Sequence, residues 1–252
     1  LIESSNSIKI MNIKQARKNS IDNQIRPWGG LDYIANNALK SIPRENFVPD
    51  NYKNLAFSDI EIPLTNKAKM LSPKVEGRLL DALNIKKNET VLEVGTGSGY
   101  LTAVLSKLCH SVTSIEIDKT LSNDAQERIK DLNINNVTLE TGDASKGWKR
   151  SKEFFDVVVI GASVPKITGR FYHLLNVGGR VFVVEGTGKA MSAKIITRLS
   201  EHKWETKSLF ETQLDVMQGL EVSEKFKSLS WKEYDWLKDL VEIIEKNENP
   251  EH

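Results

Sequence analysis

The sequence predicts an α/β fold in which helices cover a doubly wound, mostly parallel sheet. Three observations predict it. Short runs rich in Val and Ile alternate with segments whose apolar residues recur every three or four positions. The runs are apolar at consecutive positions, as in strands that are buried on both faces. The first clear run leads directly into a glycine-rich loop, Gly95–Gly99, that opens a helix.

The residues before the sheet are expected to form a helical N-terminal region, residues 11–74. Ile21 and Ile25 begin an apolar stripe of helical spacing that continues through residues 31–39. Residues 26–30 interrupt this stripe, because they contain a proline and two glycines. We therefore expect two helical segments with a break between them.

Residues 75–222 are expected to form the domain that contains the sheet, after an irregular connection over residues 63–73. The predicted elements are a helix over residues 75–83, strands over 90–94, 111–117, 137–140, 155–160 and 180–184, and helices over 100–108 and 121–132. Residues 194–199 and 207–213 are expected to close one edge of the sheet as a hairpin.

Both ends of the chain are expected to lie outside this domain. Residues 1–10 form a non-native or disordered lead without the features of a secretory signal peptide. In the tail, residues 223–252, an apolar stripe over Ser230–Lys246 predicts a C-terminal helix. This helix is expected to pack on the domain; the alternative is that it binds a partner or substrate.

Composition excludes several classes of protein. The 252 residues include 35 Lys and Arg against 34 Asp and Glu, a net charge of +1, whereas nucleic-acid and membrane-surface binders usually carry a basic excess. No apolar run approaches the roughly 20 residues that span a bilayer. The single cysteine, Cys109, excludes an intrachain disulfide and a Cys-rich metal site. We expect a cytoplasmic globular protein that binds neither nucleic acid, membrane nor metal.

The loop Gly95-x-Gly97-x-Gly99 predicts a ligand site. Glycine permits positive φ and lets a ligand approach the backbone, and the amino end of the next helix offers unpaired N–H groups. A phosphate-binding loop would need lysine after the last glycine, where Tyr100 stands. A dinucleotide fingerprint would need glycine at position 100. Both of these ligand classes are therefore disfavoured.

Two acidic residues complete a nucleoside site. Glu116 ends the second strand, 21 residues after Gly95, where a carboxylate can accept hydrogen bonds from two ribose hydroxyls. Asp143 follows the third strand and can accept from the amino group of adenine, or it can simply form a turn. The spacing predicts a nucleoside ligand without a pyrophosphate.

These motifs resemble the S-adenosylmethionine-dependent methyltransferases. The residues that carry the resemblance are Leu92-Glu93-Val94-Gly95-Thr96-Gly97-Ser98-Gly99-Tyr100, Ser114-Ile115-Glu116-Ile117, Gly142-Asp143-Ala144 and Phe155-Asp156. A narrower resemblance, to the protein-L-isoaspartate O-methyltransferase family, extends from about Asp22 to Gly186. It rests on Pro43-Arg44-Glu45-Asn46-Phe47-Val48-Pro49, Ala56-Phe57-Ser58-Asp59, Ile62-Pro63-Leu64 and Gly142-Asp143 followed by Gly147-Trp148.

The resemblance implies a Rossmann-like, seven-stranded, mostly parallel methyltransferase sheet with S-adenosyl-L-methionine as cofactor. It implies esterification of L-isoaspartyl carboxylates in damaged proteins, a repair reaction, with residues 11–74 covering substrate and cofactor. The implied cofactor-binding residues are Leu71, Glu93, Gly95, Thr96, Gly97, Ser98, Gly99, Tyr100, Glu116, Ile117, Asp143 and Ala144.

The loop between Pro63 and Pro73 departs from the family pattern Gly-x-Gly-Gln-Thr-Ile-Ser-(Gln/Ala)-Pro. Aligning the prolines without a gap puts Leu71 at the family serine, whose position is close to the transfer site. A shift of one residue would put Ser72 there, so Ser72 is the candidate catalytic residue. Ser163 and Val164, after the fourth strand, are candidates for the wall of the acceptor site.

A carboxylate acceptor is already ionised at neutral pH and needs no general base. His110, His173, His202 and His252 have no carboxylate or cysteine neighbours at catalytic spacing, so they are expected to have surface or packing roles. Cys109 is expected to be a small buried hydrophobe.

Two other functions remain open. The altered loop over residues 65–72 allows the same cofactor site to act on a biosynthetic peptide or a small metabolite. The chain could also be a non-catalytic cofactor-binding partner protein that uses Trp231 and Trp236 of the tail.

Overall fold

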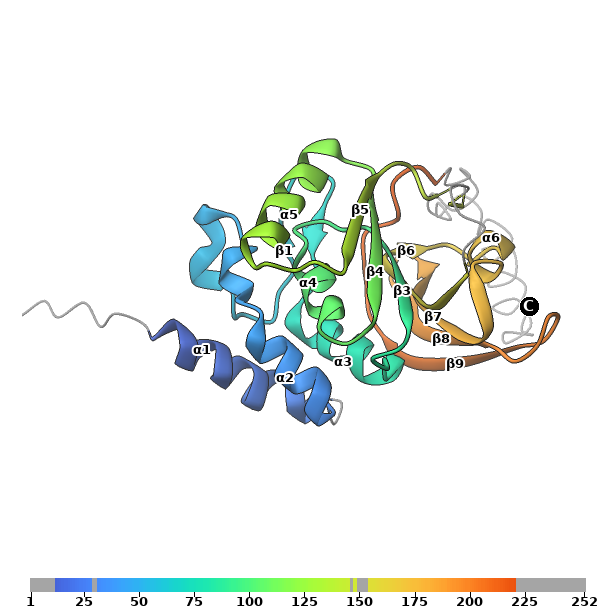
Figure 1. The fold of residues 1–252 in the computed structure, drawn as a ribbon, viewed down its shortest axis with the longest axis horizontal. Coiled ribbons are helices and arrows are strands. Elements are labelled where there is room, and N and C mark those ends of the chain that lie inside the picture. The colour runs from blue at the N-terminus through green and yellow to red at the C-terminus, as the bar shows by residue number, and fades with distance from the viewer. Residues whose placement is uncertain (1–11, 29–30, 146, 149–153, 221–252) are drawn as a thin grey trace, which may run out of the picture. The chain divides into compact units, whose positions relative to one another are not determined.

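The computed structural model describes residues 12–28, 31–145, 147–148 and 154–220 (Figure 1). The lead over residues 1–10 and the C-terminal helix over Ser230–Lys246 lie outside the described residues. No helix in the described ranges is long and apolar enough to cross a membrane.

The N-terminal region is helical, as predicted. Its elements are α1 (Ile13–Ser20), η1 (Ile21–Ile25), η2 (Arg26–Trp28), α2 (Tyr33–Ser41), η3 (Arg44–Asn46) and η4 (Asp50–Leu55). Asn12 and Asp32 cap α1 and α2, because their side-chain oxygens accept hydrogen bonds from Gln15 N at 3.1 Å and Ala35 N at 2.6 Å. The change from helix to the short η2 falls at the predicted break.

The prediction of an irregular connection over residues 63–73 is wrong at Pro63, Lys69 and Met70, which belong to strands. Strands β1 (Ile62–Pro63) and β2 (Lys69–Met70) pair in antiparallel fashion, with Ile62 opposite Met70. Strands of two residues have no periodicity, so the sequence pattern could not reveal them. On this short hairpin Met70 is buried, whereas Lys69 points away from the core.

The sheet has seven strands in the described residues, and its topology confirms the predicted fold. The strands are β3 (Thr90–Val94), β4 (Ser111–Glu116), β5 (Val137–Thr141), β6 (Phe155–Val164), β7 (Leu175–Thr187), β8 (Ala190–Arg198) and β9 (Trp204–Glu211). Their order is β5-β4-β3-β6-β7-β8-β9. The first five are parallel, and β8 and β9 add the predicted antiparallel hairpin at one edge (Figure 1).

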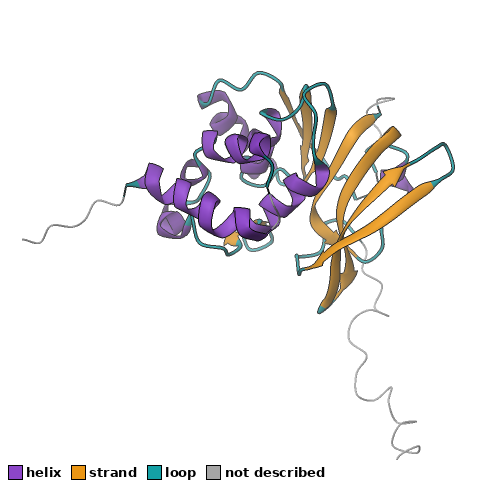
Figure 2. Ribbon diagram, turned by 90° about the horizontal axis from the view of Figure 1, so that it is seen from below, coloured by secondary structure: helices purple, strands orange, loops and turns teal. Residues whose placement is uncertain are grey.

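The helices of the domain are α3 (Pro73–Leu83), α4 (Tyr100–Ser106), α5 (Lys119–Asp131) and α6 (Gly169–Tyr172). Figure 2 shows the helices gathered beside the strands, most of them on one side. Val157, Val158, Val159 and Ile160 of β6 are all fully buried, although neighbouring side chains point to opposite faces of the sheet. Both faces of this central strand are therefore covered, as the continuous apolar runs predicted.

Two strands are longer than predicted. β6 continues past Ile160 through Gly161–Val164 with a shift in register against β7, and β7 begins at Leu175, before Gly178-Gly179. Glycine usually marks a strand end or a bulge. Here it marks irregularities inside the strands, and Gly178 has a φ of +87°.

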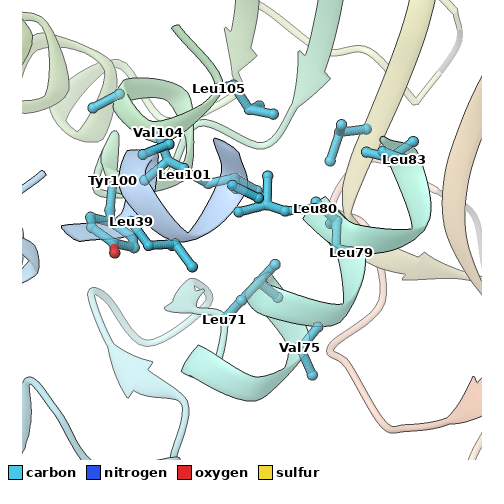
Figure 3. Packing of buried hydrophobic residues seen from close by; sticks show 14 of the residues in the cluster. Leu39, Leu71, Val75, Leu79, Leu80, Leu83, Tyr100, Leu101, Val104 and Leu105 are labelled. Atoms are coloured by element: carbon cyan, nitrogen blue, oxygen red, sulfur yellow. The ribbon is translucent and has the colours of Figure 1, made fainter. Parts of the chain in front are cut away.

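The N-terminal region shares a core with the sheet domain. Figure 3 shows Leu39 of α2 among the side chains of α3 and α4, including Leu80, Tyr100 and Leu101. Leu71, which lies just before α3, belongs to the same cluster. The segment that leads from the N-terminal region to α3 is thus held in place by packing.

Candidate active site

The site lies where the strand order changes direction. β4 and β6 flank β3, so the loops after these parallel strands meet at one edge of the sheet, the place where open α/β sheets bind ligands. A pocket opens there. It is lined by Glu61, Lys67, Ala68, Lys69, Leu71, Val94, Gly95, Gly97, Ile115, Glu116, Ile117, Gly142, Asp143, Ala144, Ser145, Gly161, Ala162 and Leu214–Gln218.

The glycine loop needs its glycines for different reasons. Gly95, Gly97 and Gly99 have φ values of +95°, +55° and +84°. A Cβ on Gly95 would have no protein atom within 4 Å and would occupy space beside the pocket. A Cβ on Gly99 would lie 3.0 Å from the Cβ of Ala125 on α5. Gly95 thus leaves room for a ligand, while Gly99 permits the close packing of α4 and α5.

Glu116 connects three loops. Its carboxylate accepts hydrogen bonds from Gly97 N at 2.8 Å and Asp118 N at 3.0 Å, and its backbone carbonyl accepts from Gly142 N at 2.8 Å. The side chain is buried but lines the pocket. A carboxylate has about four lone-pair positions, so Glu116 retains capacity for ligand hydroxyls.

Asp143 reaches the same pocket from the loop after β5. Its Oδ1 accepts a hydrogen bond from Ser145 N at 2.9 Å. The motif Gly142-Asp143 with Gly147-Trp148 has a steric explanation, because a Cβ on Gly142 would be 2.8 Å from the Trp148 ring. The indole lies against the backbone that precedes Asp143 and thereby fixes the position of this carboxylate.

Glu93 lies behind the glycine loop, fully buried. Its Oε2 accepts hydrogen bonds from the hydroxyls of Thr102 and Ser114, the latter at 2.7 Å, and its Oε1 has no partner. Burial raises the pKa of Glu93 to about 7, although these hydrogen bonds act in the opposite direction. Glu93, Thr96, Ser98 and Tyr100 line a smaller recess that also touches Leu71 and Gly95.

One wall of the pocket is formed by Leu214–Gln218, which belong to a segment over residues 212–219 that we call the strap (red in Figure 1). Ser163 holds it, because its N–H donates to Asp215 O, its hydroxyl donates to Leu214 O and its carbonyl accepts from Met217 N, each at 2.9 Å. Ser163 and Val164 themselves are buried and do not line the pocket. The expectation that they form its wall is therefore corrected: Gly161, Ala162 and the strap form it.

The strap also contacts the hairpin of β1 and β2. The Lys69 ammonium lies 2.8 Å from Asp215 Oδ2 and 3.6 Å from Glu61 Oε2. The side-chain amide of Gln218 donates to Lys67 O at 3.1 Å. The loop that departs from the family pattern is thus joined to the strap across one side of the pocket.

Arg44 positions Leu71. This buried guanidinium donates to Leu71 O at 2.8 Å and Ala56 O at 3.0 Å, and it forms an ion pair with Glu76 of α3. Ser72 takes the N-cap position of α3 and does not line the pocket. Of the two candidates for the family serine position, the structure brings Leu71 to the site and leaves Ser72 outside it.

The sequence-predicted residues divide into three groups. Leu71, Gly95, Gly97, Glu116, Ile117, Asp143 and Ala144 line the pocket, Glu93, Thr96, Ser98 and Tyr100 line the recess, and Gly99 and Ser72 line neither. The sequence interpretation missed the strap, Lys69 and Lys67. The strap has no strand or helix period, so no pattern in the chain indicated its position.

This donor set fits S-adenosyl-L-methionine. The pocket offers an open approach at Gly95, two carboxylates for hydroxyl and amino donors, and the unpartnered oxygen of Glu93 behind the loop. No three His, Cys, Asp or Glu side chains are arranged to hold a metal ion in the described part of the chain.

Protein-L-isoaspartate O-methyltransferases from two organisms match most of the chain. A protein-L-isoaspartate O-methyltransferase from Syntrophus aciditrophicus is 35% identical over 188 residues, which is 75% of this chain and 86% of the relative. One from Petrotoga mobilis is 30% identical over 191 residues, which is 76% of this chain and 90% of the relative.

Solved structures share the fold. A structure described as a beta-aspartate methyltransferase from Plasmodium falciparum, in complex with S-adenosyl-L-homocysteine, superposes with a TM-score of 0.69 at 20% identity. The match covers 80% of this chain and 98% of that chain.

A family model described as protein-L-isoaspartate(D-aspartate) O-methyltransferase matches residues 18–216. The chain therefore belongs to the protein-L-isoaspartate O-methyltransferase family.

Proposed function

We propose that this protein methylates the free carboxylate of L-isoaspartyl residues in damaged proteins, with S-adenosyl-L-methionine as methyl donor. One observation carries the proposal. One side of the pocket contains Glu116 and Asp143, whose carboxylates suit an adenosyl group. The other side of the same pocket is formed by Leu71, Ala162 and the strap. The cofactor supplies an activated methyl group when bound, and the second side leaves space for an acceptor.

Each residue has a separate task in this proposal. Glu116 accepts hydrogen bonds from the ribose hydroxyls, and Asp143 accepts a hydrogen bond from the amino group of adenine. Ile117 contributes an apolar surface to the pocket. Gly95 lets the cofactor approach the backbone. Glu93 places an acceptor oxygen behind the loop, on the side where the cationic end of the cofactor would lie.

The chemistry requires orientation and exclusion of water more than proton transfer. The free carboxyl of an isoaspartyl residue is an α-carboxyl, whose pKa of roughly 3.3–3.7 leaves it ionised at neutral pH. Holding the nucleophile in line with the methyl carbon can supply roughly 7–11 kcal/mol. None of the described residues that line the pocket is a histidine or cysteine. Cys109 is buried away from it, and burial raises the pKa of its thiol to about 12.

We propose further that residues 11–74 form the covering region and residues 75–222 the cofactor-binding domain. Glu61, Lys69 and Leu71 support this division, because they reach the pocket from the N-terminal side. The near-neutral charge supports polypeptide acceptors in place of nucleic acid or membrane. A single cysteine, with no second one to pair with, is compatible with action in the cytoplasm.

Methyl transfer tests the proposal directly. The protein is incubated with radiolabelled S-adenosyl-L-methionine and either an isoaspartyl peptide or the same peptide with normal aspartate. We expect base-labile methyl ester on the isoaspartyl peptide only. Equal labelling of both peptides, or of neither, would refute isoaspartyl specificity.

The second candidate function is methylation of a different carboxylate acceptor. The altered loop over residues 65–72 favours it, because this loop departs from the family pattern and part of it lines the pocket. Turnover with a biosynthetic peptide or small metabolite, without turnover of isoaspartyl peptides, would support this alternative. Tight cofactor binding without turnover on any carboxylate would instead support a non-catalytic partner protein.

A further inference from the structure

We propose that Lys69 recognises the negative charge of the methyl acceptor, and that Asp215 holds this lysine until the acceptor carboxylate replaces it. The inference rests on the proposed function and specifies how the acceptor is chosen. In this inference Lys69 binds the carboxylate of the acceptor. In the free protein, the Asp215 carboxylate occupies the same place beside the Lys69 ammonium.

The hairpin geometry places Lys69 beside the acceptor side of the pocket. Side chains two residues apart on an extended strand point to the same side, about 7 Å from each other. Lys69 in β2 and Leu71 directly after this strand both line the pocket, although Leu71 is itself buried, and Met70 between them lines only the smaller recess. Leu71 is also the residue that occupies the family serine position. Lys69 therefore lies on the side of the pocket that we propose for the acceptor.

The pair between Lys69 and Asp215 is suited to exchange. The two atoms are 2.8 Å apart, yet the side chains are 40% and 59% exposed. Exposed ion pairs contribute little to stability, because water solvates both charges and mobile side chains lose entropy when they pair. A second carboxylate can therefore displace Asp215 at little cost.

The strap does not depend on this pair for its position. Ser163 binds it through three hydrogen bonds, and Gln218 ties it to Lys67 O. Asp215 uses its backbone carbonyl for the contact with Ser163. Its side chain is thus available to hold Lys69 without a second structural duty among these contacts.

Lys69 matters for binding an anionic acceptor because carboxylates outnumber lysines around the pocket. The described lining residues include four carboxylates, those of Glu61, Glu116, Asp143 and Asp215, and two lysines, Lys67 and Lys69. An anionic acceptor would be repelled by such a pocket without a cation directed at it. Lys69, two residues before Leu71, is the lining cation closest in sequence to that residue.

Two substitutions with opposite expected effects test the inference. Lys69→Gln should raise the KM for an isoaspartyl peptide about tenfold, the scale of a charge-assisted hydrogen bond, with kcat and cofactor affinity little changed. Asp215→Asn should lower the KM roughly two- to fivefold, because it frees Lys69 for the acceptor. Lys207→Gln on exposed β9 removes the same charge far along the chain and should leave the KM unchanged.

If Lys69→Gln and Asp215→Asn change the KM in the same direction, the pair is a structural tie and the inference is overturned. An unchanged KM in Lys69→Gln overturns it as well.

A binding measurement separates this inference from the proposed function. The wild-type protein, loaded with S-adenosyl-L-homocysteine, is titrated with an isoaspartyl peptide and with its carboxamide analogue. We expect preference for the carboxylate in the wild type and loss of this preference in Lys69→Gln. Carboxylate preference without methyl transfer contradicts only the proposed function, and equal binding of the two peptides contradicts only the role of Lys69. Absent binding of both peptides contradicts the isoaspartyl acceptor of the proposed function, on which this inference rests.

Discussion

At the scale of single residues, Glu93 shows how burial changes chemistry. The carboxyl group is fully buried behind the glycine loop, and desolvation raises its pKa from 4.5 to about 7. The hydroxyls of Thr102 and Ser114 favour the ionised form but do not offset the loss of water. The native state therefore binds this proton more tightly than the unfolded chain does.

This difference predicts a pH dependence of stability. The contribution of Glu93 is fully present below about pH 4.5 and is lost as the pH rises through about 7. Between pH 5 and pH 8 the wild type should lose about 2–3 kcal/mol of unfolding free energy that Glu93→Gln does not lose. Urea denaturation of both proteins at the two pH values measures it. Equal losses in the two proteins would show that Glu93 does not titrate in this range.

Glu116 allows a prediction about the cofactor. Glu116→Ala should weaken binding of S-adenosyl-L-homocysteine by about 1.5–3 kcal/mol, the scale of a charge-assisted hydrogen bond. Calorimetric titration measures the affinity, with Glu127→Ala on α5 as a control acid outside the pocket. Melting curves are needed too, because Glu116 also accepts from Gly97 N and Asp118 N. Unchanged affinity in Glu116→Ala would mean that this carboxylate does not bind the ribose.

At the scale of elements, the glycine loop separates a role in packing from a role in binding. Gly95, Gly99 and Gly188 all have positive φ, but only Gly99 has a close neighbour at the position of a Cβ. Gly188, in the turn between β7 and β8, has no atom within 4 Å there. Gly188→Ala therefore measures backbone strain alone.

The three alanine variants should consequently differ. Gly188→Ala and Gly95→Ala should each cost about 1–2 kcal/mol of stability, from the backbone conformation. Gly99→Ala should cost at least about 1 kcal/mol more, because its methyl group would press on Ala125. Gly95→Ala should in addition lose cofactor affinity, although its methyl group contacts no protein atom and adds no packing cost. Urea denaturation and calorimetry test this order; equal stability of the Gly99 and Gly188 variants would contradict it.

At the scale of the whole molecule, the buried pair of Arg44 and Glu76 joins the N-terminal region to α3. Arg44 also stacks on Tyr100 of α4, with the guanidinium carbon 4.7 Å from the ring centre. A buried charge is costly unless it is paired and hydrogen-bonded. The same guanidinium holds Leu71 O, so the contact that fixes the N-terminal region also fixes one side of the pocket.

Breaking this pair should be costly. Arg44→Met leaves the Glu76 carboxylate buried without its partner and should reduce the unfolding free energy by about 3–5 kcal/mol. The double variant Arg44→Met/Glu76→Leu should recover part of this loss, because no uncompensated charge remains. Urea denaturation of the three proteins tests it. A double variant no more stable than Arg44→Met would show that packing around Arg44, and not its charge, matters.

The sequence by itself determined the fold class and brought together the residues on the side of the pocket that we propose for the cofactor. Strand and helix periods are local properties, and the spacing of Gly95, Glu116 and Asp143 places each residue at the carboxyl end of a strand. Parallel strands bring these ends to one edge whatever the loops contain. That side of the site could therefore be predicted without knowledge of any long-range contact.

Only the tertiary structure decided the other side of the pocket, where we propose that the acceptor binds. It brought Leu71, not Ser72, to the pocket, and it paired Lys69 with Asp215, a residue more than a hundred positions away. The strap and the short hairpin have no period that a sequence pattern can reveal. Their positions depend on hydrogen bonds between residues far apart in the chain, such as those from Ser163 to Leu214 and Asp215.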